Sequence, residues 1–257
     1  MRGEPILRIR NVSLRFGGIV ALDGVSFDVG AGEICGLIGP NGAGKTTLFN
    51  CLNGLYAPTG GDIFFRDEPL LRAAPNDIAR LGIGRTFQNL ALFHSLSVRQ
   101  NVLVGAHTRR RTGFASDALR LPSVRGEEMR LDKEVDALLD LLDLRGVAHQ
   151  SIDVLPFGVR KRLELARALA SKPKLLLLDE PAGGLNHQEV DQLRSLILSI
   201  RDTFELAVLL VEHHMNLVMR VSDRVVALDF GRKIAEGSPA EMQSHPAVIR
   251  AYLGTAA

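Results

Sequence analysis

The sequence predicts an α/β fold, with a mixed, mostly parallel sheet, an antiparallel β lead-in and an inserted α-helical subdomain. Apolar segments of strand length alternate with amphipathic segments toward both ends of the chain, as in a sheet with helices on both faces. A glycine-rich loop at residues 39–47 separates one apolar segment from a helical one. From about residue 89 to residue 170 the spacing of apolar residues is mostly helical.

Composition and charge are those of a globular protein. The chain has 257 residues, of which 46% are hydrophobic and 23% are charged, enough for one large domain or one domain with a subdomain. The net charge of +2 argues neither for nor against nucleic-acid binding. The longest apolar runs, at residues 175–178 and 206–211, are far shorter than the ~20 residues of a membrane-spanning helix. We therefore expect the chain not to cross a membrane by itself.

The expected elements follow from periodicity and from turn residues such as glycine and proline. Strands are predicted at residues 6–9, 12–16, 25–29, 34–38, 63–65, 83–88, 174–179, 206–211 and 224–229. Helices are predicted from residue 47 and at residues 75–81, 98–104, 127–144, 161–170, 188–201, 215–221, 239–243 and 247–253. We expect one domain over residues 1–257, with an α/β core from residues 1–88 and 171–257 and a helical subdomain, 89–170, inserted into it.

The loop at residues 39–47 fits the pattern glycine, four residues, glycine, lysine and serine or threonine. Such a P-loop curves so that consecutive backbone N–H groups face phosphate oxygens at the start of a helix, whose dipole favours anions. It predicts a P-loop NTPase (RecA-like) core that binds a nucleotide and Mg²⁺. The expected nucleotide contacts are Gly39, Asn41, Gly42, Gly44, Lys45, Thr46 and Thr47. Among them, Lys45 can reach the β- and γ-phosphates, and the hydroxyl group of Thr46 can bind Mg²⁺.

A second element of the predicted phosphate site is acidic and follows the leucine run at residues 175–178. A strand buried on both faces would carry Asp179 and Glu180 to its carboxyl end. Asp179 is the expected Mg²⁺ ligand, and Glu180 is expected to orient or deprotonate the attacking water. The alternative is a strand that simply ends in a solvated acidic turn.

Residues 155–169, directly before this acidic strand, narrow the class of nucleotide-hydrolysing protein. Here the chain resembles the ATP-binding subunits of ABC transporters, whose Leu-Ser-Gly-Gly-Gln signature precedes a basic helix; the resemblance covers nearly the whole chain. It implies that Phe16 stacks on adenine, that Gln88 contacts Mg²⁺ and the attacking water, and that His213 contacts the γ-phosphate. The alternatives are a core phenylalanine, an ordinary loop amide and a core histidine.

Four positions depart from the family pattern. Pro156 replaces the serine of the signature and Val159 its final glutamine, while Asn186 and His214 replace aspartates. Proline supplies neither a hydroxyl group nor an N–H donor. In this family the signature faces the γ-phosphate held by a partner subunit in a head-to-tail dimer. The departures are therefore either tolerated or the mark of an asymmetric dimer.

Residues 85–88, 181–186, 212–219 and 250–254 are similar to the larger of two unlike ATPases in branched-chain amino acid importers. This resemblance implies ATP hydrolysis coupled to transmembrane transport of branched-chain amino acids or related small polar solutes. It implies permease subunits, a second ATP-binding subunit and, indirectly, a solute-binding protein as partners, and no nucleic acid. The expected location is the cytoplasmic face of the inner (plasma) membrane, as a peripheral subunit.

Other functions remain open on the sequence. The main rival is the ATPase of a lipid or polysaccharide ABC exporter, followed by a soluble ABC ATPase outside transport. A P-loop kinase is disfavoured by the signature-like helix and by His213, and a GTPase by the lack of a base-reading motif. The basic stretch at residues 107–130 is interpreted as a solvated loop or as a contact with anionic lipid.

Overall fold

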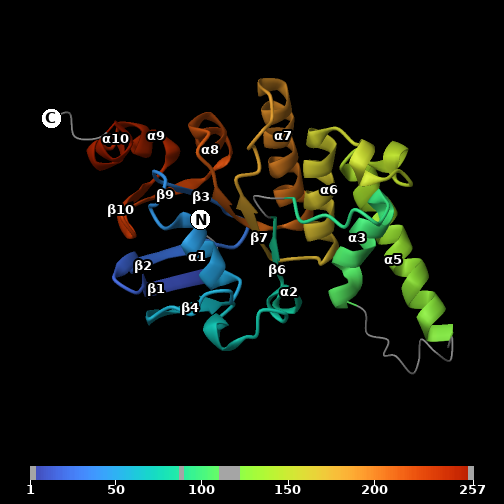
Figure 1. Ribbon diagram of the computed structural model, residues 1–257, viewed down its shortest axis with the longest axis horizontal. Coiled ribbons are helices and arrows are strands. Elements are labelled where there is room, and N and C mark those ends of the chain that lie inside the picture. The colour runs from blue at the N-terminus through green and yellow to red at the C-terminus, as the bar shows by residue number, and fades with distance from the viewer. Residues whose placement is uncertain (1–3, 87–89, 110–121, 254–257) are drawn as a thin grey trace. The chain divides into compact units, whose positions relative to one another are not determined.

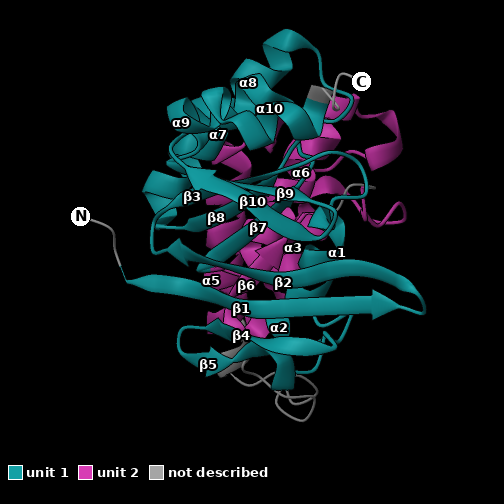
Figure 2. Cartoon of the chain, turned by 90° about the vertical axis from the view of Figure 1, so that its left-hand side faces the viewer, with its two compact units in different colours: residues 1–78, 174–257 teal, residues 79–173 magenta. Residues whose placement is uncertain are grey.

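The computed structural model describes residues 4–86, 90–109 and 122–253, and Figure 1 shows its elements. The chain divides into two compact units, coloured separately in Figure 2. Unit 1 comprises residues 1–78 and 174–257, and unit 2 comprises residues 79–173. No helix within the described ranges combines the length and the apolar character that a membrane span requires.

An antiparallel sheet in unit 1 has the strand order β2-β1-β4-β5. Its strands are β1 (Pro5–Phe16), β2 (Ile19–Gly30), β4 (Gly60–Phe65) and β5 (Glu68–Pro69). Leu7, Ile9 and Val12 are fully buried along β1. The register shifts between Ile9 and Val12, around Asn11, which has a positive φ of 49°. The two predicted strands at residues 6–9 and 12–16 are therefore one continuous strand with an irregularity.

The second sheet forms the centre of unit 1, and the strands that unit 1 contributes to it have the order β10-β9-β3-β8-β7. Its strands are β3 (Ile34–Ile38), β7 (Leu175–Asp179), β8 (Ala207–Val211), β9 (Arg224–Asp229) and β10 (Arg232–Gly237). Every residue of β3, β7 and β8 is buried, which explains their continuous apolar sequences. β10 was not predicted, and it pairs antiparallel with β9.

The register of the parallel strands aligns their carboxyl ends. Val211 is opposite Asp179 on one side and opposite Leu37 on the other. The loops that follow β3, β7 and β8 therefore start at the same edge of the sheet, where α/β proteins bind their ligands.

Unit 1 also contains α1 (Lys45–Leu52), α7 (His187–Phe204), α8 (Met215–Val221), α9 (Pro239–Ser244) and α10 (Pro246–Leu253), and η1 (Leu70–Arg72) is a 3₁₀ turn. One core cluster joins strand residues Ile38 and Val225 to Val218 of α8, Met242 of α9 and Val248 of α10. Burying these side chains fixes the short C-terminal helices against the sheet. α2 (Ile78–Leu81) lies at the boundary between the units.

Unit 2 is helical, with α3 (Val98–Ala106), α5 (Pro122–Leu141), α6 (Phe157–Ala170) and the short strand β6 (Ile83–Arg85). The 3₁₀ turns η2 (His107–Arg109), η3 (Arg145–Val147) and η4 (Ile152–Val154) complete it. α3 packs closely on α6 at Gly105, where an added Cβ would lie 2.1 Å from the carbonyl oxygen of Arg167. α6 begins four residues before the predicted residue 161. β6 ends at Arg85, and residues 87–88 of the predicted strand lie outside the described residues.

Candidate nucleotide-binding site

The glycine-rich loop connects buried β3 to α1, as the motif requires. Gly39, Gly42 and Gly44 have φ values of 153°, 81° and 98°, a region that favours glycine. A Cβ on Gly39 would lie 2.3 Å from the carbonyl oxygen of Leu228, and one on Gly44 would lie 2.6 Å from that of Ala21. Gly44 caps α1 without a side-chain hydrogen bond. The first N–H groups of the helix are thus available to an anion.

Lys45 lies within this loop and is only 7% exposed. Its ammonium group donates to the carbonyl oxygens of Gly39, at 2.6 Å, and Pro40, at 2.9 Å. Burial lowers the pKa of Lys45, while the charges of Glu180 and Asp179 raise it. The ammonium group therefore lies close enough to both carboxylates for their negative charge to favour its protonated form.

The acidic pair follows β7 as expected. Asp179 is the last residue of the strand and is buried, whereas the side chain of Glu180 is 22% exposed. The N–H of Glu180 donates to the carbonyl oxygen of Val211 at 2.9 Å, and its φ is +48°. Such a backbone conformation is costly for a residue other than glycine and is often found at functional sites. The buried carboxylate of Asp179 and the hydroxyl group of Thr46 are oxygen donors of the kind that Mg²⁺ prefers.

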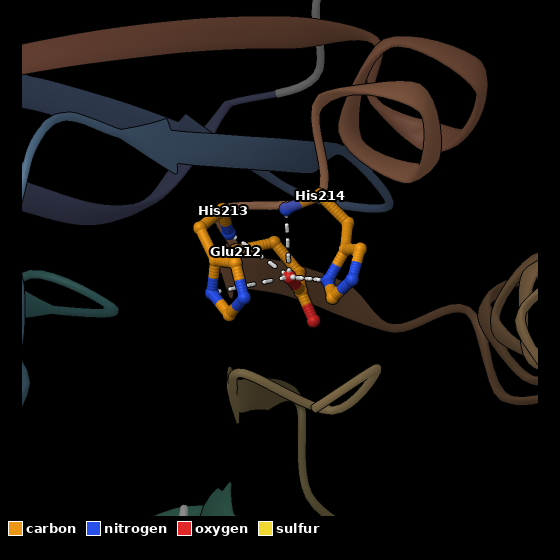
Figure 3. A group of neighbouring side chains, drawn as sticks. All are labelled: Glu212, His213 and His214. Carbon is orange, nitrogen blue, oxygen red and sulfur yellow. Dashed lines mark hydrogen bonds and ion pairs between the residues drawn. The ribbon is translucent and has the colours of Figure 1, made fainter. Parts of the chain in front are cut away.

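The loop after β8 contributes Glu212, His213 and His214, which Figure 3 shows with both imidazole rings beside the Glu212 carboxylate. Nδ1 of His213 lies 3.8 Å from a carboxylate oxygen of Glu180. The side chain of His213 is 51% exposed, so it is not a core histidine. No role was predicted for Glu212, because a glutamate in the sequence carries no sign that its side chain is buried.

Glu212 is fully buried and accepts hydrogen bonds from three backbone N–H groups. One carboxylate oxygen accepts from Ala182, at 2.7 Å, and the other accepts from His213, at 2.9 Å, and His214, at 3.1 Å. These bonds join the turn that follows Glu180 to the loop that carries His213. Because both oxygens accept backbone hydrogen bonds, we interpret Glu212 as a structural junction between these two segments.

Phe16 lies at the end of β1 and is 45% exposed, so it is not a core residue either. Its ring meets that of Tyr56 edge-on, with the centroids 5.2 Å apart. An exposed ring held by a second aromatic residue is suited to stacking on a planar ligand. Its contact with adenine stays a prediction.

Comparison with known proteins identifies the family. A model described as ABC transporter matches residues 22–183, and one described as branched-chain amino acid ATP-binding cassette transporter matches residues 232–257. The high-affinity branched-chain amino acid transport ATP-binding protein LivG of Escherichia coli (strain K12) is 42% identical over 98% of this chain and 99% of its own length. The chain belongs to the ABC transporter family. As a member it is an ATPase that serves a transporter, and the predicted resemblance is confirmed.

Two further relatives agree with this assignment. The corresponding protein BraF of Pseudomonas aeruginosa is 41% identical over 98% of this chain and 99% of its own. The crystal structure of an ATP-binding cassette of an ABC transporter in its ADP conformation has a TM-score of 0.84 and 28% identity, over 97% of this chain and 99% of its own. The predicted P-loop NTPase fold is confirmed by this match.

The ABC signature lies in unit 2. Pro156 is the N-cap residue of α6 and makes no side-chain cap hydrogen bond. Gly158 falls within the first turn of α6, so the helix begins inside the signature rather than after it. The groups that the start of this helix could offer to an anion are the backbone N–H groups of its first turn.

Asn186, directly before α7 in unit 1, has a structural role. It is the N-cap residue of α7, and its side chain accepts from the N–H of Glu189 at 3.0 Å. Glu189 in turn accepts from the N–H of Asn186 at 2.8 Å, which completes a capping box. Asparagine and aspartate are about equally good N-cap residues, which explains why this departure is compatible with the fold.

Two sequence predictions concern residues that lie wholly or partly outside the described ranges. Gln88 lies outside the described residues, as do residues 110–121 of the basic stretch. Arg109 forms an ion pair with Glu134 at 2.5 Å. Burial would raise the pKa of Glu134, but hydrogen bonds from Arg109 and Lys172 lower it to about 2. Arg109 is thus engaged within unit 2, which weakens the interpretation of this arginine as a lipid contact.

Proposed function

We propose that this chain is the ATP-binding and ATP-hydrolysing subunit of an importer for branched-chain amino acids or related small polar solutes. The observation that carries the proposal is the 42% identity to LivG, which extends over 98% of the chain. The match of residues 232–257 to the C-terminal model of branched-chain amino acid cassettes supports the same solute class.

The site geometry supports a division of roles. Residues 39–47, with Lys45, bind the phosphates, and Phe16 stacks on the base. Glu180 orients and deprotonates the attacking water, and His213, whose Nδ1 is 3.8 Å from Glu180, contacts the γ-phosphate. Thr46, Asp179 and Gln88 would hold Mg²⁺, which when bound neutralises charge on the phosphates.

The partners follow from the same assignment. Two permease subunits and a second, unlike ATP-binding subunit would complete the transporter, with a solute-binding protein delivering the cargo. The chain would then be a peripheral subunit on the cytoplasmic face of the inner membrane. ATP binding would close the two ATP-binding subunits on each other, and hydrolysis would release them.

The test is uptake by the purified complex in proteoliposomes. With ATP inside and the binding protein outside, we expect uptake of radiolabelled leucine. Glu180→Gln should keep ATP affinity within about twofold, while the hydrolysis rate at its site falls about 10²–10⁴-fold. Lys45→Ala should lose ATP binding. Normal hydrolysis at the Glu180→Gln site would refute the assigned role of Glu180.

The rival exporter is distinguished by direction and cargo. An exporter would carry lipid or polysaccharide out of the compartment that holds ATP and would need no binding protein. Leucine uptake that depends on the binding protein excludes it. If leucine uptake is absent while ATP hydrolysis is intact and is stimulated by a lipid-linked substrate, the exporter is favoured.

A further inference from the structure

The first residue of the P-loop is held by the last described helix of the chain. The N–H of Gly39 donates to the hydroxyl oxygen of Tyr252, in α10, at 2.8 Å. Gly39 is buried, and an added Cβ would lie 2.3 Å from the carbonyl oxygen of Leu228. This position therefore has no room for a side chain, and the phenol provides a partner for the buried N–H of Gly39.

Packing explains why Tyr252 reaches this position. Val248, one helical turn earlier, is 5% exposed and belongs to the same core cluster as Ile38, the residue before Gly39. Side chains four residues apart share a face of a helix. Burial of Val248 beside the end of β3 thus brings Tyr252 to the start of the P-loop.

The carbonyl group of Gly39 contacts Lys45. The carbonyl oxygen of Gly39 accepts from the ammonium group of Lys45 at 2.6 Å, while its N–H donates to Tyr252. Gly39 therefore links the C-terminal helix to the lysine that the proposed site uses for phosphate. Burial raises the pKa of Tyr252, and the hydrogen bond from Gly39 lowers it. The net shift is upward, so the phenol is neutral at physiological pH.

We propose that Tyr252 is a positioning residue for the nucleotide site, which keeps the P-loop in its phosphate-binding conformation by fixing the main chain of Gly39. A loop that is already ordered loses less conformational freedom when it binds a ligand. The phenol thereby raises the affinity for ATP without touching the nucleotide. This gives a function to the segment matched by the C-terminal family model, and it rests on the proposed nucleotide site.

The experiment compares Tyr252→Phe, which removes only the hydroxyl group, with Ile249→Ala, an exposed position on the same helix. Titration calorimetry with ATP should show roughly three- to tenfold weaker binding for Tyr252→Phe and no change for Ile249→Ala. The hydrolysis rate of the complex at saturating ATP should stay within about twofold. Hydrogen exchange of the Gly39 amide, without nucleotide, should be faster in Tyr252→Phe only.

Two results would overturn the proposal. One is ATP affinity and Gly39 exchange equal to wild type in Tyr252→Phe. The other is weaker binding accompanied by a clearly lower unfolding temperature, which would mean that the phenol only stabilises the fold. Lys45→Ala distinguishes a failure of the role of Tyr252 from a failure of the proposed nucleotide site. If Lys45→Ala loses ATP binding while Tyr252→Phe binds ATP like wild type, only the role of Tyr252 fails. If Lys45→Ala binds ATP normally, the proposed nucleotide site fails as well.

Discussion

Lys45 shows how a single residue combines structural and chemical roles. Its ammonium group is buried and donates to two carbonyl oxygens of its own loop. These contacts use two of the three N–H donors of the ammonium group and leave one for a phosphate oxygen. Burial lowers the pKa of Lys45, but Glu180 and Asp179 raise it and favour the charged form. The two acids thus offset part of the effect of burial, and the net shift of the Lys45 pKa is downward.

Glu212 leads to a prediction at the same scale. Glu212→Gln replaces one accepting oxygen with an NH₂ group that would face backbone N–H donors. We expect the loop of His213 to shift and kcat to fall roughly tenfold, because a buried donor left without an acceptor costs about 1–3 kcal/mol. KM for ATP should change less than about twofold, since the P-loop is untouched.

Steady-state ATPase kinetics of the complex check this prediction. Glu205→Gln, at an exposed position after α7, is the matched control and should behave like wild type. A change in KM with kcat unaltered would contradict a role of Glu212 in positioning the hydrolytic residues.

Among the elements, α7 depends on a specific cap. Asn186 and Glu189 form reciprocal hydrogen bonds at its first turn. Asn186→Ala should lower the free energy of unfolding by about 1 kcal/mol, whereas Asn186→Asp should leave it nearly unchanged. Urea unfolding followed by circular dichroism measures both. Equal stability of the alanine variant and wild type would show that the cap contributes nothing.

The whole molecule raises the question of the second ATP-binding subunit. In the proposed head-to-tail dimer, the Pro156 and Val159 of this chain would leave the partner's nucleotide fewer contacts. We therefore expect an asymmetric dimer, in which the site built on Lys45 and Glu180 performs most of the hydrolysis.

Glu180→Gln in the assembled transporter tests this asymmetry. If the other ATPase remains wild type, total ATP hydrolysis should be almost completely lost. Loss of only about half would mean that both sites turn over and that the altered signature is functional. The equivalent substitution in the partner serves as the matched control and should reduce hydrolysis only slightly.

The central sheet explains how the candidate site is assembled from distant parts of the chain. The loops that carry Lys45, Glu180 and His213 follow β3, β7 and β8, whose carboxyl ends are aligned. Residues far apart in the sequence therefore meet because their strands are neighbours in one parallel sheet. The P-loop and the acidic strand could be recognised separately, but neither reveals this order of strands.

Local signals made part of the protein predictable. The glycine pattern at residues 39–47 reflects backbone conformations that other residues adopt poorly, and the leucine run before Asp179 reflects a strand buried on both faces. β10 was missed because its sequence, Arg232–Gly237, carries charged residues and lacks an apolar pattern, as the edge strand of a sheet often does.

The sequence by itself determined the phosphate-binding loop, the acidic pair and the family, because each depends on residues that are adjacent in the chain. Only the tertiary structure decided that the Glu212 carboxylate joins the loops of Glu180 and His213, and that Tyr252 meets Gly39 across 213 positions. Such contacts depend on which side chains are buried together. Burial results from the packing of distant strands and helices, and no local pattern encodes it.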